Sequence, residues 1–214
     1  PNTLQLYLNM IILVRKFNDE EVDKLIKFRN SLSDDIKKTR KDNLDKMDDK
    51  LPSIDYIKNQ LNDLTGIRYI LNYLMINHGF RNKDLNLKFV KSLPENKEEN
   101  YIMHKGKNII LNINDYKTDK SHGTKEIKIN DPKFIKEFKS LDLKDGDYIL
   151  PMKNGDKINN IITFNDRILK LTIDKLGQNR LVKIVVKDLL NHKSFEKLDQ
   201  ISKDRGTSLE VLLK

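Results

Sequence analysis

The chain of 214 residues contains no cysteine and no tryptophan. Without cysteine it has neither a disulfide framework nor a thiolate metal site, which fits a reducing compartment. The longest apolar run, residues 8–14, is interrupted by Asn9 and is far too short to cross a bilayer. It has no basic segment before it and no small-residue cleavage site after it, so no signal peptide is predicted. We therefore expect an intracellular protein that does not enter a membrane.

Two common kinds of ligand-binding motif are missing as well. The glycine patterns of the P-loop and of dinucleotide-binding folds do not occur, so no nucleotide cofactor is expected. The four histidines are scattered and show no metal-ligand spacing, so no bound metal is expected either. Their positions are His78, His104, His122 and His192.

Charge, in contrast, is abundant: 41 Lys and Arg stand against 32 Asp and Glu, for a net charge of +9. This surplus favours a polyanionic partner, which can be DNA, RNA or an anionic membrane surface. Lys, Asn, Ile and Asp dominate the composition, as A+T-rich coding would produce, and that origin explains the lysines equally well. Charge alone therefore leaves the partner open.

The first fifty residues read as a helical region followed by a linker. Residues 3–17 read as a helix with apolar residues on most faces. Asn18, with Glu21 three residues later, has the pattern of the start of a second helix. Residues 33–50 are almost entirely charged, with six Lys or Arg against six Asp, which is typical of a solvated helix or linker. Pro52 and Ser53 then predict a new start, so we expect one unit over residues 1–50 and a second over residues 51–214.

The second unit is predicted to be α+β, mostly helical with a small three-stranded antiparallel sheet. Helices are expected up to residue 64 and over residues 67–78, and again from Asp131-Pro132 and from Ile161 onward, with breaks at Gly177 and Gly206. The sheet is expected from residues 101–104, 108–113 and 126–129, with a hairpin turn at residues 105–107 and a further short strand at residues 148–150.

A motif with chemical meaning closes the helix over residues 67–78. Gly79-Phe80-Arg81 is followed by Asp84-Leu85. This segment resembles the box that holds the first catalytic arginine of tyrosine recombinases, DNA strand-exchange enzymes that form a 3′-phosphotyrosine. A guanidinium at a helix end can donate two N–H groups to a phosphate, and an acid three residues later can hold the turn. The resemblance covers most of the chain in order and spacing, and it implies a recombinase-like catalytic domain preceded by the end of a core-binding domain.

In that family a lysine on the β-hairpin protonates the leaving 5′ oxygen. Lys117 is the best match by position, with Lys120 and Lys125 as alternatives, because an ammonium can neutralise phosphate charge and release a proton. The other cations of this region are expected to contact DNA: Lys105, Lys107, Lys120, His122 and Lys125. The competing interpretation is that these lysines only solvate an exposed hairpin.

The third box departs from the family pattern of a histidine followed three residues later by an arginine. Aligned on Leu181, Asn179 replaces the histidine and Val182 the arginine; shifted by one residue, Arg180 and Lys183 take those places. We expect Arg180 or Lys183 to face the Arg81 site from a helix that begins near Asn179.

The last motif is Arg205-Gly206-Thr207-Ser208, which resembles the family's Gly-His-Ser box and makes Arg205 a candidate DNA contact. The nucleophilic tyrosine would then lie just beyond Lys214. Three functions follow from these motifs: a recombinase or integrase of a virus or mobile element, an inactive relative that binds double-stranded DNA, and a structural or virion scaffold. The resemblance implies self-association on DNA and a location in the cytoplasm or nucleus of a host cell, or in a virion.

Overall fold

The computed structural model describes residues 2–48, 51–95, 98–116 and 123–213. The chain forms two compact units, Pro1–Leu51 and Pro52–Lys214. The boundary lies one residue from the one expected from the sequence. Among the described residues, no helix is both long enough and apolar enough to cross a bilayer.

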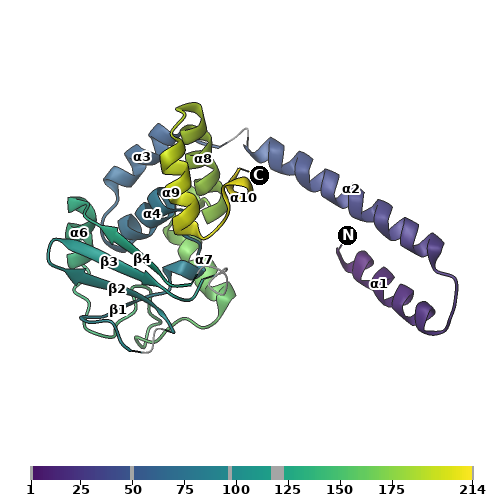
Figure 1. The fold of residues 1–214 in the computed structure, drawn as a ribbon, viewed down its shortest axis with the longest axis horizontal. Helices are drawn as coiled ribbons and strands as arrows, with labels where there is room; N and C mark the ends of the chain where they lie inside the picture. Colours follow the sequence, from purple (N-terminus) through teal and green to yellow (C-terminus); the bar gives the residue numbers. More distant parts are fainter. Residues whose placement is uncertain (1, 49–50, 96–97, 117–122, 214) are drawn as a thin grey trace. The chain divides into compact units, whose positions relative to one another are not determined.

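The first unit is a hairpin of two helices, α1 (Asn2–Phe17) and α2 (Asp23–Asp48), which lie side by side in Figure 1. Leu8 and Ile12 of α1 are buried. The prediction of a helix start at Asn18 is wrong. The Asn18 N–H donates to the carbonyls of Val14 and Arg15, so Asn18 closes α1.

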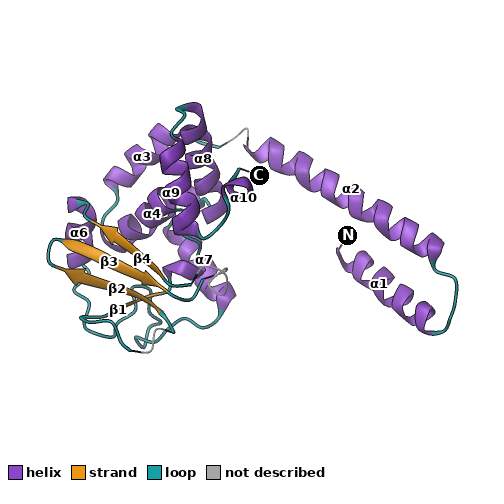
Figure 2. Ribbon diagram, viewed as in Figure 1, coloured by secondary structure: helices purple, strands orange, loops and turns teal. Residues whose placement is uncertain are grey.

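The second unit is α+β, as expected, with helices packed beside one sheet (Figure 2). The sheet has four strands in the order β1 (Leu87–Phe89), β2 (Asn100–Lys105), β3 (Asn108–Ile113) and β4 (Lys125–Ile129). The three predicted strands are present as β2, β3 and β4 and pair antiparallel. The expectation of a three-stranded antiparallel sheet is nevertheless wrong, because β1 adds a parallel fourth strand beside β2.

The strand predicted at residues 148–150 is reduced to one isolated bridge between Tyr148 and Lys88 of β1. Backbone hydrogen bonds extend this contact on both sides, from Phe89 to Asp147 and from Ile149 to Leu87. The segment therefore covers the outer edge of β1 without forming a longer ladder.

The helices of this unit begin where the sequence supplies capping residues. Ser53, Asp131, Asn160 and Ser208 each accept a hydrogen bond from a backbone N–H in the first turn of the helix that follows. These helices are α3 (Ile54–Asp63), α6 (Pro132–Lys139), α7 (Ile161–Leu171) and α10 (Leu209–Leu212). The remaining helical segments are α4 (Gly66–His78), η1 (Lys83–Leu85), η2 (Ile173–Lys175), α8 (Gln178–Asn191) and α9 (Phe195–Arg205).

The central element of the core is α4, which contacts α3, α6, α7, α8 and α9. Seven of its thirteen residues are buried, including Ile70, Leu71 and Leu74 with no exposed surface. One buried residue is polar: Asn72 donates to the Leu171 carbonyl and accepts from the Ile173 N–H, which fixes the end of α7. The candidate site begins at the C-terminal end of α4.

Candidate functional site

The candidate site begins at Gly79, which ends α4 in the left-handed conformation, with φ of 65°. A Cβ at this position would lie 2.9 Å from the Cγ2 of Ile201 on α9. Glycine is thus required both for the turn and for the close approach of α9. Phe80 follows and is completely buried, which anchors the chain just before Arg81.

Arg81 is held at both its backbone and its side chain. Its backbone N–H donates to Oδ2 of Asp84 at 2.8 Å, which confirms the expectation that the acid three residues later holds the turn. Its guanidinium Nη1 donates to the backbone carbonyl of Arg205 at 2.5 Å. Arg81 therefore links the end of α4 to the end of α9, 124 residues away in the sequence.

Arg205 makes the reciprocal contact. Its Nη1 donates to the Gly79 carbonyl at 2.5 Å, and its Nη2 donates to Oδ1 of Asn179 at 3.1 Å. The side chain is buried, and burial together with the positive charge of Arg81 lowers the pKa of the Arg205 guanidinium to about 10. Arg205 thus lies near Arg81 with its guanidinium engaged at helix ends, and its role as a DNA contact stays a prediction.

Asp84 is the carboxylate at the centre of this group, and only 2% of it is exposed. Burial raises the pKa of Asp84, while the Arg81 N–H and the charges of Arg81, Lys125 and Arg205 oppose that rise. Three cations therefore act on one buried carboxylate. We call Arg81, Asp84, Lys125 and Arg205 the basic cluster.

Among the described residues, Lys125 is a candidate lysine that the fold brings near Arg81. It begins β4, and its Nζ donates to the Asp204 carbonyl at 3.2 Å and lies 3.9 Å from the centre of the Tyr116 ring. Burial and the charge of Arg81 lower its pKa to about 8, against the opposing charges of Asp84 and Asp204. Lys125 is one of the two alternatives to Lys117 that the sequence offers for the proton donor. Lys117, Lys120 and His122 lie outside the described residues.

The start of α8 also reaches the basic cluster, whereas the expectation that Arg180 or Lys183 faces the site stays a prediction. The helix begins at Gln178, whose Oε1 accepts the Asn82 N–H at 2.5 Å, and the next residue is Asn179, which binds Arg205. These contacts involve Gln178 and Asn179, neither of which was a candidate. Arg180 follows on the same turn and is half-buried, while Lys183 is exposed one turn later.

Lys105 and Lys107 are not brought to the basic cluster. They are exposed at the turn between β2 and β3, where Lys105 pairs with Asn108. Lys125 pairs with Ile113 at the opposite end of β3. Five residue steps along a strand separate the two ends by roughly 17 Å.

The loops around the basic cluster are fixed by Asn100, which is 2% exposed. Its Oδ1 accepts the N–H groups of Asn114 and Asp115 at 2.8 and 2.7 Å. Its Nδ2 donates to the carbonyls of Asp115 at 2.9 Å and of Lys83 and Asp84, both at 3.4 Å. Asn100 thus ties the turn that carries Asp84 to the end of β3.

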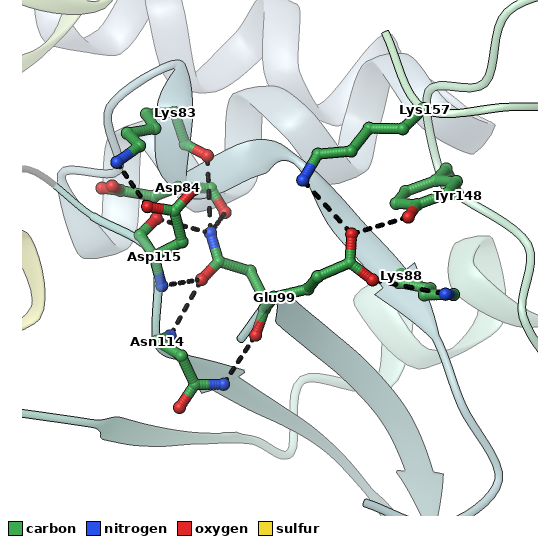
Figure 3. Close-up of polar contacts among 9 residues, drawn as sticks. Lys83, Asp84, Lys88, Glu99, Asn114, Asp115, Tyr148 and Lys157 are labelled. Atoms are coloured by element: carbon green, nitrogen blue, oxygen red, sulfur yellow. Dashed lines mark hydrogen bonds and ion pairs between the residues drawn. The ribbon is translucent and has the colours of Figure 1, made fainter. Parts of the chain in front are cut away.

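The neighbouring residue Glu99 holds a second set of segments (Figure 3). It accepts hydrogen bonds from Tyr148 Oη at 2.7 Å, Lys157 Nζ at 3.2 Å and Lys88 Nζ at 3.3 Å. Burial opposes its ionisation, but these three donors outweigh burial and lower the pKa of Glu99. Lys83 and Asp115 form a further ion pair in the same view. Sequence patterns gave no signal for Glu99 or Asn100.

Comparison of this chain with family models, curated proteins and solved structures gave no match. The chemical groups of the basic cluster indicate what it can bind. Guanidinium and ammonium groups donate strongly to phosphate oxygens, and a lysine with a pKa of about 8 exchanges its proton near neutral pH. The described residues contain no group of His, Asp or Glu side chains placed to hold a metal ion.

Proposed function

We propose that this protein binds the phosphate backbone of double-stranded DNA at the basic cluster and is of the tyrosine recombinase type. The observation that carries the proposal is that three cations from distant segments meet at the ends of α4 and α9. Arg81 donates to the Arg205 carbonyl, Arg205 donates to the Gly79 carbonyl, and Lys125 donates to the Asp204 carbonyl. The charge of the second unit supports it, since residues 52–214 contain 30 Lys and Arg against 22 Asp and Glu. A polyanion is the natural partner of such a surface.

Under this proposal the residues have separate roles. Arg81 binds a non-bridging phosphate oxygen, and Lys125, in place of Lys117, donates a proton to the leaving 5′ oxygen. Arg205 holds the end of α4 in position, and the N-terminal amides of α8 add to the anion site. Strand cleavage also needs a nucleophile, for which the resemblance places a tyrosine beyond Lys214.

A second candidate is a recombinase-like fold that binds DNA, or serves as a scaffold, without catalysis. Two observations favour it. Asn179 and Val182 replace the expected histidine and arginine, and the guanidinium groups of Arg81 and Arg205 contact the protein's own backbone. Arg81 and Arg205 each donate to a carbonyl at a helix end, as purely structural residues would. The two candidates differ in whether Arg81 and Lys125 matter for DNA or only for stability.

The test of DNA binding is a salt titration of the full chain with a short duplex, followed by fluorescence anisotropy. We expect the logarithm of affinity to fall linearly with the logarithm of salt concentration. Arg81→Met and Lys125→Met should each weaken binding roughly tenfold at about 0.1 M salt and reduce the salt slope by about one.

Lys107→Met is the matched control, because it removes one charge at the opposite end of β3. We expect it to change affinity less than twofold. Salt-insensitive binding would contradict the proposal. Equal losses for Lys107→Met and Lys125→Met would move the DNA site away from the basic cluster, and no binding at low salt would favour the scaffold.

DNA affinity should also depend on pH through Lys125. The Lys125 ammonium is charged below its pKa of about 8 and loses its charge as the pH rises through that value. Affinity should therefore fall severalfold between about pH 7 and 9.5, with a midpoint above 8, because a bound phosphate favours the ammonium. Anisotropy at constant ionic strength measures this. Lys125→Met should lose most of the pH dependence; an unchanged profile in that variant would rule out Lys125 as its source.

A further inference from the structure

The helical hairpin of the first unit leaves one side of α1 uncovered. Eight large apolar side chains of α1 are between 45% and 89% exposed. We call this set the α1 apolar face; it comprises Leu4, Leu6, Tyr7, Met10, Ile11, Leu13, Val14 and Phe17. The two α1 side chains that are buried, Leu8 and Ile12, lie on another side of the helix. The hairpin therefore uses one stripe of α1 and leaves a second, wider stripe that α2 does not cover.

The α1 apolar face has the spacing of a helix-packing surface. At 3.6 residues per turn its eight residues occupy one half of the helix circumference. Tyr7, Met10, Val14 and Phe17 follow one another at intervals of three, four and three, which is the spacing of a heptad seam. Apolar residues flank the seam on both sides, so the stripe is broad enough to pack against two neighbouring helices.

The exposed area is that of a protein interface. With roughly 100 Å² of exposed surface on each side chain, the face amounts to on the order of 800 Å². A standard interface buries about 800 Å² on each partner, whereas the largest apolar patch of an ordinary monomer covers about 300–600 Å². Burial of this face can therefore support a specific, stable association.

The charges of the first unit favour an identical partner. No charged residue belongs to the α1 apolar face, so two copies can meet there without like charges in contact. Residues 1–51 contain eleven Lys and Arg against ten Asp and Glu, so two copies of the unit repel each other little. A helix that lies on a membrane surface carries basic residues along its polar side. Here α1 has only Arg15 and Lys16, both in its last turn.

We propose that a second copy of this chain docks on the α1 apolar face, so that α1 and α2 of two copies form a four-helix bundle. The association is isologous, with the two α1 helices antiparallel about a two-fold axis. Met10 lies at the middle of the face, where that axis passes. This dimer does not depend on DNA or on the basic cluster.

Sedimentation velocity of the full chain without DNA tests the dimer. We expect a concentration-dependent dimer, and Met10→Glu should raise its dissociation constant at least a hundredfold, because the charge would be buried without a partner. Asn9→Glu is the control, since it adds the same charge outside the α1 apolar face, next to Arg29 of α2, whose Nη1 donates to the Asn9 Oδ1 at 3.5 Å, and it should leave the dimer unchanged. A chain that stays monomeric up to ~100 µM overturns the proposal.

Disulfide trapping tests the antiparallel pairing of the two α1 helices without adding a charge to the α1 apolar face. Because the chain has no cysteine, Met10→Cys and Asn9→Cys each introduce a single thiol. Met10→Cys should form a covalent dimer under mild oxidation, and Asn9→Cys should not. Equal or absent crosslinking of both variants overturns the antiparallel pairing. Flotation of a monomeric chain with anionic phospholipid vesicles would assign the face to a membrane and would also overturn the proposal.

Discussion

Replacing Arg205 by methionine is expected to lower the free energy of unfolding by about 3 kcal/mol. The buried guanidinium donates to the Gly79 carbonyl and to Asn179, and the methionine would leave both acceptors without these donors. It would also remove one of the cations that oppose the rise in the pKa of Asp84. The relief of repulsion between Arg205 and Arg81 offsets part of this loss. We therefore expect the free energy of unfolding to fall by about as much as two charged hydrogen bonds contribute.

Urea denaturation of the two variants Arg205→Met and Lys203→Met checks this expectation. Lys203 lies on the same helix, is 70% exposed and forms an ion pair with the exposed Asp199, so its loss should cost less than about 0.5 kcal/mol. An unchanged slope with a lower midpoint would identify a loss of native stability. An Arg205→Met protein within about 1 kcal/mol of the parent would show that this clamp between α4 and α9 contributes little.

Replacing Asn100 by leucine should cost about 3–4 kcal/mol of unfolding free energy. The side chain accepts two backbone N–H groups and donates to three carbonyls, and leucine would leave the buried members of this set without partners. Because these partners belong to the turn after Arg81 and to the end of β3, the loss should also loosen the basic cluster. Faster hydrogen exchange at Asn114 and Asp115 would report that loosening.

Asn100→Asp is the informative control. A carboxylate keeps the two accepted hydrogen bonds from Asn114 and Asp115 but cannot donate to the three carbonyls when ionised. We expect a smaller loss than for leucine at low pH, where the protonated carboxyl keeps the two accepted bonds and donates one O–H to a carbonyl. The loss should grow as the pH rises, because a buried carboxylate would then face carbonyl oxygens. If aspartate and leucine destabilise the protein equally, the accepted bonds are not what makes Asn100 necessary.

Local sequence patterns predicted much of the fold correctly. Ser53 and Asp131 cap helices because a short side-chain oxygen can accept a nearby backbone N–H. Gly79 ends α4 because only glycine tolerates both the positive φ and the approach of Ile201. By contrast, β1 has only three residues and no alternation that a periodicity test could detect. Its existence depends on pairing with β2 and with Tyr148, both distant from it in the chain.

The candidate site divides in the same way. The sequence by itself identified Arg81 as a candidate site residue. The residues that position it, Gly79, the buried Phe80 and Asp84, all lie within a few residues of it in the chain. The sequence also determined that a helix begins beside Asn179. Only the tertiary structure showed that Lys125, among the described lysines of the hairpin, lies near Arg81, and that Arg205 closes the cluster from 124 residues away. The same holds for Glu99 and Asn100, whose partners come from residues 83–84, 88, 114–115, 148 and 157. The physical reason is that caps and turns depend on neighbours in sequence, whereas electrostatic and hydrogen-bonding partners depend on which ends of strands and helices the packed core brings together.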